Sequence, residues 1–131
     1  MIGGGDVPKR TFKTEQILDA LFETARIELD FDNPILLESG EESEILQRAS
    51  DLLYDEPSLV ASNGFENTME LVFEYGGVYW RIYFDQNDGA HYNDLLGCNE
   101  FERPWKVEQK EFEAVQVEKA TKMVEYWKEV P

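Results

Sequence analysis

Cysteine, histidine and basic residues are all scarce in this chain of 131 residues. The one cysteine, Cys98, cannot form a disulfide within the chain, and a cysteine-rich zinc site is excluded. The one histidine, His91, has no second histidine or cysteine cluster with which to share a metal, which is typical of a surface loop residue. The sequence therefore predicts no metal, no cofactor and a reducing compartment.

Long apolar runs are missing as well. No stretch approaches the roughly 18 apolar residues of a membrane-spanning helix, and residues 1–6 lack the apolar core of a secretion signal. We therefore expect no contact with membranes and a protein that remains in the cytoplasm.

Recognisable catalytic patterns are also missing. Gly3–Gly5 is not followed by the Gly-Lys-Ser/Thr of a phosphate loop, and neither Cys98 nor any serine lies in a nucleophile elbow. One enzyme hypothesis remains, in which Glu108 and Lys110, spaced Glu-x-Lys, hold magnesium with an upstream carboxylate such as Asp94, as in a nuclease. Because a strongly acidic enzyme repels nucleic acid, we rank this hypothesis third and expect a non-enzymatic protein without catalytic residues.

Negative charge is what the sequence has in excess. It contains 28 acidic and 12 basic residues, for a net charge of −16. The segment 15–100 is the most acidic, with twenty Asp and Glu against three Arg. Such a field repels nucleic acid and anionic membranes, whereas it attracts basic surfaces in a salt-sensitive manner. We therefore expect a basic protein partner and no direct binding of nucleic acid. Acidity that only maintains solubility is the alternative.

Two helices are predicted in the first half of the chain. Thr14 can cap a helix over residues 15–29, where apolar residues recur at three- and four-residue steps. The segment Asp32-Asn33-Pro34 ends this helix, since proline cannot continue a helix. A second apolar stripe predicts a helix over 41–54, and Pro57 closes it.

A β-hairpin is predicted over residues 68–84. Two alternating strands flank Gly76–Gly77, the permissive pair of a tight turn. The second strand has an apolar face for the core and a second face formed by Tyr79, Arg81 and Tyr83. That second face either packs under a helix or loop or forms a contact surface, because Tyr and Arg are frequent at interface hot spots.

The fold class follows from these elements. After a polar connection over residues 85–104, the chain alternates apolar and polar residues as strands do, although a helix over 112–128 is an alternative. We expect one α+β domain over residues 1–131, with two N-terminal helices packed on a small antiparallel sheet built around the hairpin. Residues 1–12 are expected to be flexible.

The segment Phe73–Phe84, with the polar loop and the valine- and glutamate-rich ending that follow it, resembles the second half of small acidic proteins of bacterial tailed phages. The resemblance covers about residues 73–130. It implies an anti-defence role, such as that of anti-CRISPR proteins, in which a basic surface of a host enzyme is occupied. The location would then be the cytoplasm of the host cell, and no individual residue role is carried over.

Our leading hypothesis is an inhibitor that occupies the basic nucleic-acid-binding surface of a host protein as a DNA mimic, with carboxylates in place of phosphates. The predicted contact residues are Glu38, Glu41, Glu42, Glu44, Asp51, Asp55, Glu56, Asp85, Asp88 and Asp94, together with Tyr79, Arg81 and Tyr83 of the hairpin. The alternative is a phage assembly or accessory protein that forms homodimers or other contacts through the aromatic hairpin. Carboxylates scattered over all sides would remove the geometric basis of phosphate mimicry.

Overall fold

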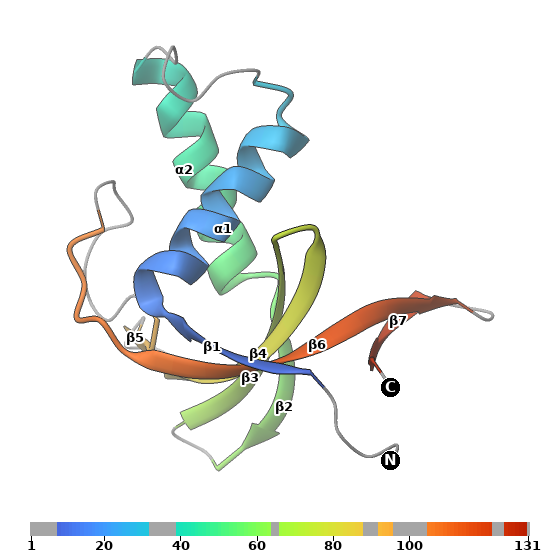
Figure 1. The fold of residues 1–131 in the computed structure, drawn as a ribbon. Helices are drawn as coiled ribbons and strands as arrows, with labels where there is room; N and C mark the ends of the chain where they lie inside the picture. The colour runs from blue at the N-terminus through green and yellow to red at the C-terminus, as the bar shows by residue number, and fades with distance from the viewer. Residues whose placement is uncertain are drawn as a thin grey trace.

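A computed structural model describes residues 8–31, 39–63, 66–87, 92–95, 105–121 and 125–130 of the chain. Within these ranges the chain forms two helices and seven strands (Figure 1). In chain order they are β1 (Lys9–Lys13), α1 (Thr14–Glu28), α2 (Ser39–Tyr54), β2 (Ser58–Ser62), β3 (Glu66–Tyr75), β4 (Val78–Asn87), β5 (Tyr92–Asn93), β6 (Glu111–Thr121) and β7 (Glu125–Glu129).

The strands form one antiparallel sheet in the order β1-β6-β4-β3-β2, with β5 paired to β4 and β7 paired to β6. Figure 1 shows α1 and α2 side by side above this sheet. The α+β class is therefore consistent with the structure. The prediction of a small sheet built around the hairpin is wrong, because β1, β2, β5, β6 and β7 extend it to seven strands in the described residues.

β1 lies in the stretch that we expected to be flexible. Its Phe12 side chain is fully buried, and the ring packs edge-on against Phe73, Tyr75 and Trp80 at centroid distances of 5.1, 5.1 and 5.5 Å. The residues of β1 are therefore paired in the sheet, and their flexibility stays a prediction. Residues 1–7 of that stretch lie outside the described part of the chain.

Both predicted helices are present. α1 begins at Thr14, whose hydroxyl does not cap the helix but accepts a hydrogen bond from the Lys110 backbone N–H at 2.9 Å. This bond ties the start of α1 to the segment before β6. The apolar stripes of the two helices face the sheet and form the core with it. The fully buried helical side chains include Ile17, Leu18, Ala25, Ile45, Ala49 and Leu53.

The predicted hairpin is confirmed as β3 and β4. Tyr75 pairs with Val78 across a two-residue turn, in which Gly76 has φ 65° and Gly77 has φ 81°. Two successive positive φ angles define the turn that matches the twist of antiparallel strands, and glycine adopts them without steric cost.

The C-terminal segment forms strands β6 and β7, so the alternative of a helix over 112–128 is wrong. Along β6, Phe112 and Ala114 are buried on the helical side of the sheet. Val117 is also buried, but its odd-numbered position places it on the opposite face. Alternate residues of a strand point to opposite faces of the sheet, so β6 buries Phe112 and Ala114 on one face and Val117 on the other. A helix has no such alternation of two residues.

Candidate functional site

The most distinctive surface feature is a groove of about 520 Å³ between the ends of the helices and β3. It lies where β2 stops. The last pair between β2 and β3 is Ser58 with Glu70, whereas β3 continues to Tyr75 with β4 on its other side. Among the described residues no second strand covers this last part of β3. The groove therefore follows a free stretch of sheet edge.

Apolar side chains from four elements line this groove. They are Leu21 and Ile27 of α1, Leu52 of α2, Tyr79 of β4 and Trp127 of β7. The Ile27 side chain is 58% exposed, and the rings of Tyr79 and Trp127 pack together with centroids 4.8 Å apart. An exposed aliphatic residue and a pair of aromatic rings that line one concave surface are typical of a binding site.

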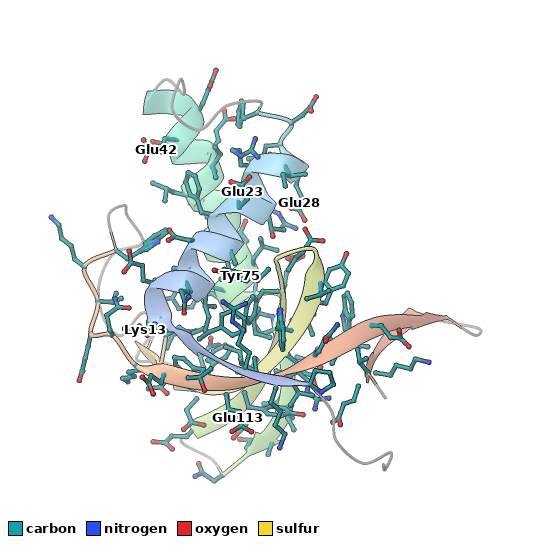
Figure 2. All side chains as sticks on the ribbon, in the orientation of Figure 1. Lys13, Glu23, Glu28, Glu42, Tyr75 and Glu113 are labelled. Carbon is teal, nitrogen blue, oxygen red and sulfur yellow. The ribbon has the colours of Figure 1, made fainter. Side chains whose placement is uncertain are left out.

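Four carboxylates surround the apolar lining. Glu28 comes from α1, Glu56 follows α2, and Glu70 and Glu74 belong to β3. Figure 2 shows Glu28 at the end of α1, in the region of the hairpin tip. These side chains are brought together only by the tertiary fold, because they come from three separate segments. The rim of the groove is therefore strongly acidic.

One arginine partly neutralises this rim. Arg48 of α2 donates hydrogen bonds to Glu28 at 2.7 Å and to Glu56 at 3.2 Å. The Glu28 carboxylate, and to a smaller extent Glu56, raises the pKa of the Arg48 guanidinium above its ordinary value. Arg48 therefore stays positively charged between Glu28 and Glu56. Glu70 and Glu74 make no ion pair within the part of the chain that the structure describes.

Strand β7 covers part of the predicted hairpin face of Tyr79, Arg81 and Tyr83. Arg81 lies on the strand next to β3, but its guanidinium is 2.6 Å from Glu129 of β7. Tyr79 packs on Trp127 of the same strand, so β7, instead of a helix or loop, covers part of this face. Tyr83 is 46% exposed and Tyr79, despite its contact with Trp127, is 37% exposed. Of the three predicted residues, the structure places Tyr79 in the groove.

Part of the set of ten acidic contact residues predicted from the sequence, which we call the acidic belt, does form one helical face. Glu41, Glu44, Asp51 and Asp55 follow α2 and its end at steps of three, seven and four residues, which places them on one side of the helix. Arg48 lies in the same row, between Glu44 and Asp51. We name these four carboxylates the α2 acidic row.

The other predicted acidic residues lie elsewhere. Glu42 is off the α2 acidic row by its helical position, and Glu56 belongs to the groove. Asp85, near the end of β4 away from the hairpin turn, accepts a hydrogen bond from Thr68 at 3.4 Å. Asp94 is 2.5 Å from the Lys110 ammonium. Glu38 and Asp88 lie outside the described residues.

The predicted belt is therefore not one continuous face. Figure 2 shows acidic side chains on different sides of the molecule, with Glu42 on α2 and Glu113 on the sheet. The prediction also omitted Glu28, Glu70 and Glu74, which line the groove. No local pattern marks these three, because each is a single charge in an ordinary amphipathic helix or strand.

The residues of the nuclease hypothesis meet only in part. Lys110 and Asp94 form an ion pair, while Glu108 is exposed. Within the described ranges, no three His, Cys, Asp or Glu side chains are grouped as metal ligands. The same ranges contain no helix with the length and apolar character needed to cross a bilayer. Comparison of the chain with protein-family models, curated proteins and solved structures found no match.

Proposed function

We propose that this protein is a non-enzymatic binding protein that occupies a basic surface of another protein. The observation that supports the proposal is the groove, in which carboxylates from α1, β3 and the end of α2 surround an apolar lining and Arg48 pairs with two of the four, Glu28 and Glu56. Such a site favours a partner that offers lysine or arginine next to an apolar side chain.

The two components of the groove contribute differently to binding. An apolar side chain buried against Leu21, Ile27 and Leu52 would contribute roughly 1.5–3 kcal/mol. Each exposed ion pair on the rim contributes only about 0.2–1 kcal/mol, and salt weakens it. The apolar contact therefore sets most of the affinity, whereas the carboxylates select basic partners and accelerate encounter.

We further propose that the partner is a host nucleic-acid-handling protein that this chain inhibits in the manner of a phage anti-defence protein. The net charge of −16 and the resemblance of residues 73–130 to tailed-phage proteins support this. The α2 acidic row supports it over a limited length. From Glu41 to Asp55 it extends about 21 Å along the helix, with neighbouring positions roughly 5 Å apart except at Arg48. Phosphate mimicry is thus assigned to α2 and the groove rim, without Asp85 and Asp94.

A lysate pull-down tests this function with matched charge variants. The double variant Glu70→Lys/Glu74→Lys changes the groove, while Glu66→Lys/Glu108→Lys changes two acidic residues outside it by the same net charge. We expect the wild type and the control to retain a basic nucleic-acid-binding protein at low salt and to lose most of it at moderate salt. The groove variant should retain little at either salt concentration. Equal capture by both variants would contradict the proposed site.

Self-association is the second candidate function, in line with an assembly or accessory role. β2 is an edge strand whose five residues are all exposed, including Leu59 at 61% and Val60 at 53%. Exposed edge strands pair readily with other chains. Sedimentation velocity over a range of protein and salt concentrations separates the two functions. A dimer that persists in high salt would favour self-association, and a monomer throughout would exclude it.

A further inference from the structure

The free part of β3 exposes unpaired backbone groups in the groove. Tyr75 and Val78 close a two-residue turn and so form a hydrogen-bonded pair. Hydrogen-bonded and non-hydrogen-bonded pairs alternate along an antiparallel ladder, so the N–H and C=O groups of Val72 and Glu74 point away from β4. The same alternation directs those of Glu70 toward β2, where Ser58 pairs with it.

Val72 and Glu74 are thus the next positions in the row that β2 would occupy if it were longer. Neither residue has a backbone partner on this side within the described ranges. Both line the groove. An uncovered strand edge with free donors and acceptors is the structure to which proteins add an extended peptide as a further strand.

We infer that the groove binds an extended basic segment of the partner protein, which pairs with Val72 and Glu74 of β3 and continues the row of β2. This inference rests on the proposed function, because it specifies how that basic partner is held. The free edge from Leu71 to Tyr75 is about 13 Å long, which corresponds to four or five residues of an added strand.

The surroundings of the edge specify the side chains of the added strand. Alternate residues of a strand point to opposite faces of the sheet. One set would face the helices, where Leu21, Ile27 and Leu52 favour apolar side chains. The other set would lie on the face of Glu70 and Glu74, where lysine or arginine is favoured. The bound segment therefore alternates basic and apolar residues.

Charge complementarity selects a partner protein over a second copy of this chain. A second copy carries a net charge of −16. Its own exposed edge strand, Ser58–Ser62, contains no basic residue to place near Glu70 and Glu74. Two such edges would bring their acidic rims together, which is unfavourable.

The first experiment uses two synthetic peptides of equal composition, the alternating peptide (Lys-Val)₄ and the block peptide Lys₄-Val₄. Amide hydrogen exchange of the wild-type protein is followed by NMR during each titration. The alternating peptide should slow the exchange of the Val72 and Glu74 amides at least about tenfold at saturation, because they gain hydrogen bonds. The Phe73 amide, which already pairs with β4, should change little. The block peptide should protect neither edge amide.

A backbone variant provides the second experiment. Val72→Pro removes an outward N–H and keeps the bonds to β4, since proline is tolerated on an edge when its nitrogen faces away from the neighbouring strand. Val72→Thr keeps the N–H and serves as the matched control. We expect Val72→Pro to weaken binding of (Lys-Val)₄ at least about tenfold and Val72→Thr to change it less than about twofold. If the proline variant does not fold, the exchange data on the wild type decide alone.

Three results would overturn the inference. Equal binding of the two peptides without protection of Val72 and Glu74 would mean attraction by charge alone, which leaves the proposed function standing. Edge amides that are protected in the free protein would show that a second copy or a segment of this chain fills the groove; dependence on protein concentration distinguishes these two. Absence of binding by either basic peptide, at low salt, would contradict the strand addition and the proposed function together.

Discussion

The Phe12→Ala substitution tests whether β1 belongs to the folded core. Phe12 is the one buried residue of a strand whose other four residues are exposed. Its ring is fully buried and packs against three aromatic rings. The substitution removes the ring and leaves a cavity between β1, the hairpin and β6, since Phe112 lies opposite Phe12 in the sheet.

The expected loss can be worked out from these contacts. Truncation of a fully buried phenylalanine costs about 3–5 kcal/mol. The edge-on aromatic pairs favour the upper part of that range, because each contributes roughly 0.5–1.5 kcal/mol beyond area burial. Domains of this size have unfolding free energies of about 5–15 kcal/mol, so the variant should stay folded but close to its limit. Urea denaturation followed by far-UV circular dichroism measures the change in the free energy of unfolding.

Thr11→Ala is the matched control, since Thr11 is the exposed neighbour on the same strand. It should change the unfolding free energy by less than about 0.5 kcal/mol. A loss below about 1 kcal/mol for Phe12→Ala would refute the reasoning, because it would mean that β1 is not packed on the sheet and that its residues are as flexible as the sequence suggested.

Three further predictions concern the turn and the groove. Gly77→Ala should lower the unfolding free energy by about 1–2 kcal/mol because φ is 81° there, whereas Gly40→Ala in α2, with open space around it, should raise it by about 0.5 kcal/mol. Thermal denaturation compares the two variants, and equal effects would contradict the turn geometry. Arg48→Gln should lower the unfolding free energy by less than about 1 kcal/mol, since the ion pairs of Arg48 are partly exposed, yet it should raise the affinity for (Lys-Val)₄ about two- to fivefold by freeing two carboxylates. Isothermal titration calorimetry measures the affinity, and weaker binding would contradict the proposed site. Trp127→Phe should abolish most of the tryptophan fluorescence change on binding of (Lys-Val)₄; an undiminished change would place the peptide elsewhere.

The elements that were predictable from the sequence are those with long local periodicity. α1, α2 and the β3–β4 hairpin each carry an apolar pattern of a dozen residues or so, with turn residues such as Gly76 and Gly77 between strands. β1 could not be found in this way, because a single phenylalanine among charged and polar residues has no period. Its burial depends on Phe73, Tyr75 and Trp80, which lie far along the chain.

The candidate site was less predictable than the fold. We selected acidic residues where they are dense along the chain. This selection found the α2 acidic row and Glu56, but it also included Asp94, which forms an ion pair with Lys110. The groove exists because β2 begins only at Ser58, opposite Glu70, while β3 continues beyond Glu70 to Tyr75. A difference in strand length between neighbours is a tertiary property, so no local window could have indicated Glu70 and Glu74 as its rim.

Competition with nucleic acid tests the central claim most directly. A fluorescent duplex oligonucleotide is bound to the basic protein retained in the pull-down, and its anisotropy is followed as this protein is added. We predict displacement of the duplex at near-stoichiometric amounts by the wild type and by Glu66→Lys/Glu108→Lys, and little displacement by Glu70→Lys/Glu74→Lys. A ternary complex, in which anisotropy rises and the duplex stays bound, would contradict occupation of the nucleic-acid-binding surface.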